Sequence, residues 1–217
     1  MQTPDKAGPP VTGMCWETPS KPVPELLDGL KAGPFAPARA AGAQQYEALL
    51  TALRREKLDK PLIFIGAGTC GLGAGAAKTL AAIRAWLSEQ SFAADVVEVG
   101  CIGLCSEEPL VDIQLPGRTR VSFGGVSADL VPSLLNTVLR KQSIAADMVL
   151  GQFRGEQFKA WDGVPYLDQH PFLVRQRRVV LAASGIIDPG NIDEYIARGG
   201  YSALAKALKS QTPDEIC

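Results

Sequence analysis

The amino-acid sequence predicts an α/β fold for residues 43–143, built as a four-stranded mixed sheet flanked by helices. Three observations support this fold class. Short apolar runs bounded by glycine or proline indicate buried strands. Stretches with leucine and isoleucine at helical spacing lie between these runs. Two later apolar runs are separated by a Pro-Gly turn, which indicates a hairpin. A length of about 100 residues suits one small domain.

The first half of this domain is predicted to be a helix followed by one β-α-β unit. Residues 43–57 place leucines on one helical face, and residues 61–66 (PLIFIG) form a short apolar run. A glycine-rich loop over residues 66–75 leads into a helix over residues 76–90, and residues 95–100 (DVVEVG) give the second strand. Because the helix crosses over between them, the two strands are expected to be parallel.

The second half of the domain is predicted to add an antiparallel hairpin and a last helix. Residues 110–115 and 120–125 are the strands of that hairpin. Ser127 is expected to N-cap a helix that runs to Lys141, because a serine hydroxyl can accept a hydrogen bond from the first helical turn. These two strands complete the four-stranded sheet.

The two ends of the chain differ from this middle part. Residues 1–42 hold half of the sixteen prolines, and we expect a Pro/Gly-rich arm or linker without regular structure. Residues 144–217 contain a strand-like run at 177–183 and helical patterns at 189–197 and 201–209, but no obvious core of their own. We interpret this segment as a linker and the incomplete opening of a larger domain that the chain does not contain.

Composition limits the classes of function. Lys plus Arg is 22 and Asp plus Glu is 23, giving a net charge of −1, so neither nucleic-acid binding nor attraction to an anionic membrane is expected. No stretch is apolar enough to predict a transmembrane helix or direct membrane insertion. Five cysteines, an odd number, do not indicate a disulfide scaffold. A cytoplasmic protein is expected, in which cysteines more often bind metals or act as catalysts than form bridges.

Three cysteines carry the main chemical signal. Cys70 lies in the loop after the first strand of the β-α-β unit, and Cys101 and Cys105 follow the second strand. Both loops lie at the same edge of a parallel pair, so the three side chains are expected to converge. Thiolates are the ligands that iron–sulfur clusters need, whereas a closed zinc site takes four ligands. The alternative is that these are small buried cysteines in glycine-rich turns.

Two other chemistries fit the residues less well. Gly66-Ala-Gly-Thr-Cys-Gly71 matches the dinucleotide-binding pattern G-x-G-x-x-G, with Glu98 as the acid for the ribose. However, a hairpin follows the second strand where further β-α units are expected. Thiol exchange through Cys101 and Cys105 is also disfavoured, because the recurring spacing for that chemistry is C-x-x-C. No catalytic residue is predicted.

The cysteine motifs resemble a known family. Gly68-Thr-Cys-Gly71 and Cys101-x3-Cys105-x3-Pro109, in the order strand, loop, helix, strand, resemble the thioredoxin-like [2Fe–2S] ferredoxin domain. In addition, residues 176–181, 185–197 and 199–204 resemble the stretch that opens the FMN- and NADH-binding domain. That domain belongs to the flavoprotein subunit of respiratory complex I and of NAD-dependent hydrogenases. The resemblance implies a thioredoxin-like fold for residues 43–143, with Cys70, Cys101 and Cys105 as ligands of a [2Fe–2S] cluster.

The sequence departs from that family in two ways. The family holds its cluster with a C-x4-C pair and a C-x3-C pair, and here Gly66 and Gly71 stand where the cysteines of the first pair would be. A fourth ligand is left open between Cys15, a donor other than cysteine, and none. The FMN, NADH and [4Fe–4S] motifs of the relatives lie beyond Cys217, so none of these cofactors is expected in this chain.

The resemblance therefore implies two functions. The first is an electron-transfer module of an NADH-linked oxidoreductase, which relays single electrons through the cluster. The second is a docking or assembly module of the same kind of enzyme that has lost its cluster. In both cases the expected partners are the other subunits of the complex or a second copy of this chain.

Overall fold

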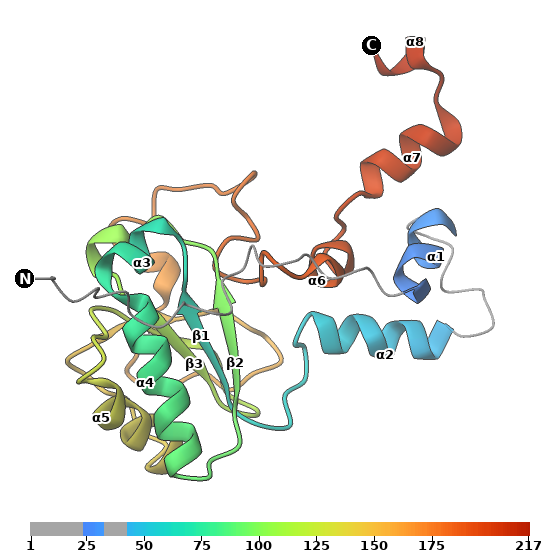
Figure 1. The fold of residues 1–217 in the computed structure, drawn as a ribbon. Helices are drawn as coiled ribbons and strands as arrows, with labels where there is room; N and C mark the ends of the chain where they lie inside the picture. The colour runs from blue at the N-terminus through green and yellow to red at the C-terminus, as the bar shows by residue number, and fades with distance from the viewer. Residues whose placement is uncertain (1–23, 33–42) are drawn as a thin grey trace, which may run out of the picture.

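The computed structural model describes residues 24–32 and 43–217 (Figure 1). Its five strands are β1 (Leu62–Gly66), β2 (Asp95–Val99), β3 (Val111–Gln114), β4 (Val121–Phe123) and β5 (Val149–Gln152). The helices are α1 (Pro24–Ala32), α2 (Ala43–Leu53), α3 (Thr69–Ala74), α4 (Ala76–Glu89), α5 (Val131–Leu135), α6 (Ile192–Ala197), α7 (Ser202–Ser210) and α8 (Pro213–Ile216). Short 3-10 turns cover Cys105–Glu107 and Leu167–Gln169, and α5 continues as a π-helical turn over Asn136–Arg140.

All five strands form one mixed sheet in the order β2-β1-β3-β4-β5. β1 and β2 are parallel, which the crossover through α4 requires. The pairs β1–β3, β3–β4 and β4–β5 are antiparallel. The first four strands thus have the order and directions expected for a thioredoxin-like α/β fold, and the predicted fold class is confirmed. The sheet has five strands rather than four, because β5 extends it beyond β4.

The main core lies between the sheet and helices α4 and α5, which cover the same face in Figure 1. Alternate residues of each strand point to this face, as the two-residue period of a strand dictates. Thr79 of α4 is fully buried here and donates its hydroxyl to the Val126 carbonyl at 2.7 Å. The apolar side chains of this core include Ile63, Ile65, Ile83, Trp86, Val111, Ile113, Val121, Phe123, Leu134 and Leu135.

The fifth strand comes from the segment that showed no core of its own in the sequence. Gly151 of β5 has φ +154°, and a Cβ there would lie 2.8 Å from the backbone nitrogen of Leu167. This close approach lets Gln152 N–H donate to the Pro165 carbonyl at 2.8 Å. Trp161, from the loop that follows, packs in the main core. Residues 149–167 therefore pack on the sheet of the preceding domain.

Three local predictions were wrong. The predicted glycine loop at 66–75 contains α3, which ends at Gly75 in the left-handed conformation (φ +107°). Ser127 does not cap α5, because its hydroxyl donates to Asp129 at 2.6 Å and the helix begins at Val131. The predicted strand at 177–183 forms turns, with Val180 92% exposed. A strand needs a neighbour to pair its backbone groups, and no described strand lies beside this segment.

A second, smaller cluster lies beside the sheet domain. Leu26 of α1, Leu50 of α2 and Ile196 of α6 are buried against one another, and Figure 1 shows these three helices together on one side of the sheet. The helix α1 lies within the arm for which no regular structure was predicted; the rest of that arm, including Cys15, lies outside the described residues. In the described part of the chain, no helix combines the length and apolar character needed to span a membrane.

Candidate metal centre

The parallel pair β1 and β2 brings the three predicted cysteines to one edge of the sheet. Cys70 is the second residue of α3, which follows the end of β1. Cys101 lies two residues beyond the end of β2, and Cys105 begins the 3-10 turn after it. Their sulfur atoms all lie within 4.8 Å of one another. The convergence predicted from the topology is confirmed.

The spacing of the sulfur atoms fits shared coordination. Cys101 Sγ and Cys105 Sγ are 3.7 Å apart. Two thiolates bound to one tetrahedral metal at about 2.3 Å have sulfur atoms about 3.8 Å apart. Cys70 and Cys105 are exposed and Cys101 is half-buried, so metal or a partner protein can reach the group from solvent. Of the described cysteines, only Cys217, after α8, lies outside this group.

The Cys105 thiol holds its proton when no metal is bound. Hydrogen bonds from Cys70 and Cys101, and their proximity, raise the pKa of Cys105 to about 12. Three negative charges within 4.8 Å would repel one another without a cation between them. Metal binding therefore displaces protons from this group.

The turn that carries Cys101 and Cys105 is stabilised by a hydrogen bond within the turn and by contacts with residues 172–178. Gly103 has φ +87° and its N–H donates to Cys101 Sγ at 3.2 Å. Arg178 donates to the Ile102 carbonyl, and the Phe172 ring lies 3.7 Å from the position of a Cβ on Gly103. Residues 172–178, far along the chain, thus fix the conformation of the cysteine turn.

The chain resembles a hydrogenase subunit. No family model matches it. It is 29% identical over 100 residues to NADP-reducing hydrogenase subunit HndB of Solidesulfovibrio fructosivorans, an alignment that covers 42% of this chain and 79% of that protein.

Two solved structures of thioredoxin-like [2Fe–2S] ferredoxins from Aquifex aeolicus also match. One is 13% identical, with a TM-score of 0.39, covering 47% of this chain and all of that chain. The other is 14% identical, with a TM-score of 0.38, covering 43% and 98%.

The tight turn between the end of β1 and α3 depends on glycine at position 71. A Cβ on Gly71 would lie 2.1 Å from the Gly66 carbonyl oxygen, so a side chain there forces the backbone apart. We predict that Gly71→Ala lowers the free energy of unfolding by about 2–3 kcal/mol. The matched control is Gly73→Ala in the same helix, where a Cβ meets nothing within 4 Å and alanine is expected to be neutral or mildly stabilising. Equal chemical-denaturation curves for the two variants would contradict this account.

The sequence analysis did not single out Glu108, which lies beside the cysteines. Its side chain is 8% exposed, and its Oε2 accepts a hydrogen bond from the Leu110 N–H at 2.8 Å. Its Oε1 is buried without a hydrogen-bond partner among the described residues. Burial raises the pKa of Glu108 by more than the Leu110 N–H and the neighbouring Cys101 thiol lower it. An acidic residue directly before a proline in the cysteine loop was the available sequence signal.

The raised pKa of Glu108 makes the metal-free fold sensitive to pH. The group has an ordinary pKa of about 4.5 in the unfolded chain, so raising the pH above that value ionises Glu108 more readily in the unfolded state and weakens the fold. We predict that metal-free Glu108→Gln is more stable than the wild type at pH 8 by about 1 kcal/mol. In thermal unfolding this advantage shrinks as the pH falls toward 4. If the unfolding temperatures of the two proteins depend on pH in the same way, ionisation of Glu108 does not weaken the fold.

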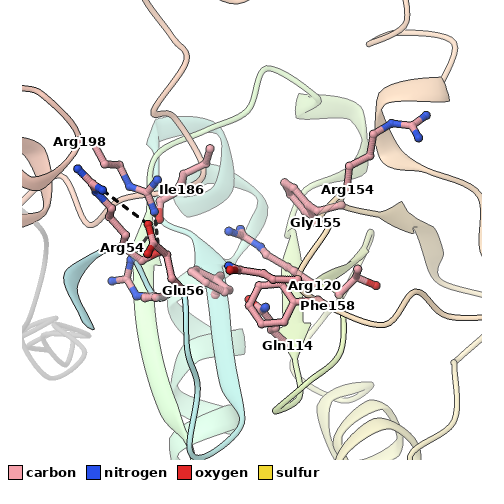
Figure 2. Close-up of a pocket in the computed structure, with 14 residues that line it drawn as sticks. Arg54, Glu56, Gln114, Arg120, Arg154, Gly155, Phe158, Ile186 and Arg198 are labelled. Atoms are coloured by element: carbon pink, nitrogen blue, oxygen red, sulfur yellow. Dashed lines mark hydrogen bonds and ion pairs between the residues drawn. The ribbon is translucent and has the colours of Figure 1, made fainter. Parts of the chain in front are cut away.

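An arginine-rich pocket of about 270 Å³ lies on the opposite face of the sheet from α4. Figure 2 shows Arg54, Glu56 and Arg198 on one side of it and Arg120, Phe158 and Arg154 on the other. Its arginines are paired within the chain, which indicates a structural role for the pocket. The ion pairs are Arg120–Asp112, Arg55–Glu194, Arg54–Glu56 and Arg154–Asp168, and Arg198 donates to the Arg54 carbonyl at 3.0 Å.

Proposed function

We propose that this chain is an electron-transfer module of an NADH-linked, hydrogenase-type oxidoreductase, and that Cys70, Cys101 and Cys105 hold a [2Fe–2S] cluster. The observation that carries the proposal is the convergence of three sulfur atoms within 4.8 Å, from two loops at one edge of the sheet. The similarity to a hydrogenase subunit supports the class of enzyme. The resemblance of residues 176–204 to the opening of a flavoprotein domain supports the link to NADH.

The cluster, when bound, supplies one-electron redox chemistry. The residues of this chain hold and tune it. The Gly103 N–H donates to Cys101 Sγ, and hydrogen bonds to ligand sulfur stabilise added negative charge. Cys70 and Cys105 remain exposed, so electrons can pass to a partner that docks on this edge. The glycines of the α3 loop allow the two cysteine loops to close around the group.

The proposed partners are the other subunits of a cytoplasmic complex or a second copy of the chain. Large apolar side chains lie exposed outside the sheet domain, which is typical of surfaces that another protein covers. Val179, Val180 and Leu181 are 75%, 92% and 61% exposed, and Leu208 of α7 is 80% exposed. Val179, Val180 and Leu181 belong to the segment that resembles the opening of the flavoprotein domain, and Leu208 follows it closely in the sequence.

A second candidate function is a docking module without a cluster. The observation that favours it is the absence of cysteine at positions 66 and 71, where the resembling family has its first ligand pair. In that case the thioredoxin-like body serves only as an interface.

A redox titration decides between the two functions. The protein is reconstituted anaerobically with iron and sulfide and titrated with dithionite while its visible absorption is followed. An electron-transfer module shows charge-transfer bands that bleach along a one-electron Nernst curve. A protein that stays colourless after reconstitution is a docking module, and the first proposal is then wrong.

A further inference from the structure

The buried carboxylate of Glu108 has one oxygen with nothing to bind. Oε2 accepts the Leu110 N–H, whereas Oε1 is buried and has no partner among the described residues. Leaving a buried charged oxygen unpaired costs free energy, because the oxygen loses its hydration and gains no hydrogen bond in exchange. Such a cost is typical of a group that is positioned for a ligand.

The carboxylate lies beside the loop that carries Cys70. A Cβ on Gly66 would lie 3.2 Å from Glu108 Oε1 and 3.0 Å from Oε2, and a Cβ on Gly71 would lie 3.1 Å from Oε2. Glu108 therefore fills the space into which side chains at both positions would extend. Cys70 lies directly before Gly71, and the Cys101 thiol is close enough to lower the pKa of Glu108.

Three thiolates leave one protein ligand of a [2Fe–2S] cluster missing, because each of its two irons takes two. Cys105 begins a 3-10 turn and Glu108 directly follows that turn, so one short segment can supply both donor atoms. Carboxylate oxygens bind first-row transition metals readily, although they are harder donors than thiolates. Glu107, the residue before, is partly exposed and receives a hydrogen bond from the Ser106 hydroxyl at 3.4 Å, so it points elsewhere.

We infer that Glu108 is the fourth protein ligand of the cluster and binds iron through Oε1. This inference rests on the proposed function, since it requires a cluster at Cys70, Cys101 and Cys105. It also explains how the chain keeps a complete ligand set with glycine at positions 66 and 71. The carboxylate, which comes from the loop after β2, fills the space beside those two glycines.

The test compares iron retention in variants of the full chain reconstituted under anaerobic conditions. Glu108→Gln is expected to lose iron to a chelator at least about ten-fold faster than the wild type. The matched control, Glu107→Gln, removes the same charge one residue away and should retain iron like the wild type. In the double variant Gly66→Cys with Glu108→Ala, a thiol enters the space that the carboxylate vacates. We expect it to retain iron again, with charge-transfer absorption about 1.3-fold stronger because four thiolates replace three.

The outcomes separate the two proposals. If the wild type takes up a cluster and Glu108→Gln keeps it with unchanged spectrum and chelation rate, Glu108 is not a ligand and the proposed function stands. If the wild type takes up no cluster, the proposed function itself fails, and the inference fails with it. If Glu108→Gln loses iron and the double variant regains it, a structural role for Glu108 does not explain the result.

Discussion

Replacing Arg120 by methionine should cost this protein about 3–5 kcal/mol of unfolding free energy, the cost of breaking a buried ion pair. Arg120 is 7% exposed, and its Nε donates to Asp112 Oδ2 at 2.8 Å. Its guanidinium lies 3.5 Å from the centre of the Phe64 ring and donates to the Gly185 carbonyl at 2.6 Å. Without it, a buried Asp112 charge has no counterion, and the segment around Gly185 loses its tie to the sheet. Denaturant unfolding of the metal-free protein measures the change.

Two further variants identify the cause of that loss. Lys60→Met breaks the exposed pair between Lys60 and Asp95, whose side chains are 50% and 56% exposed, and should change stability by less than about 1 kcal/mol. Arg120→Met combined with Asp112→Leu removes both buried charges and should recover most of the lost stability. If Arg120→Met is as mild as Lys60→Met, the buried pair does not hold the two segments together.

Cys101→Ser is expected to abolish stable cluster binding, with iron content after reconstitution falling at least about ten-fold. Cys101 lies between the two cysteine loops: its sulfur is 3.7 Å from Cys105 Sγ, and its backbone packs against Gly68. Stability of the metal-free protein should change by less than about 0.5 kcal/mol, because serine is close to cysteine in size and the side chain is only half-buried.

The matched control for this variant is Cys217→Ser, which removes an exposed thiol outside the group and should leave iron content unchanged. Equal iron content in the two variants would show that Cys101 is not a ligand. An iron-free wild type with unaltered folding and partner binding in Cys101→Ser would instead support the docking module.

The convergence of the cysteines could be predicted because it depends only on topology. A helix between two strands forces them parallel, and parallel strands end at one edge, so Cys70 and Cys101 meet although 31 positions separate them. The same local patterns located β1, α4 and β2 to within one or two residues. These elements have a clear hydrophobic periodicity, and glycine or proline residues mark their ends.

What the sequence did not predict depends on contacts between distant segments. The fifth strand contains Gly151, and a glycine inside a strand pattern normally argues against a strand. In the folded protein the backbone of Leu167 packs so closely against Gly151 that only glycine fits. Val179 and Val180 favour a strand by residue type, but no described strand pairs with them. The ion pair of Arg120 with Asp112 and the unpaired Oε1 of Glu108 could not be predicted, because both depend on how distant segments pack in the folded protein.

The most direct test of the central claim is the iron and acid-labile sulfide content of the anaerobically prepared protein, together with EPR of the dithionite-reduced sample. The account predicts a brown protein with about two irons and two sulfides per chain and an EPR signal that appears on reduction. A colourless, iron-free and EPR-silent preparation would contradict it.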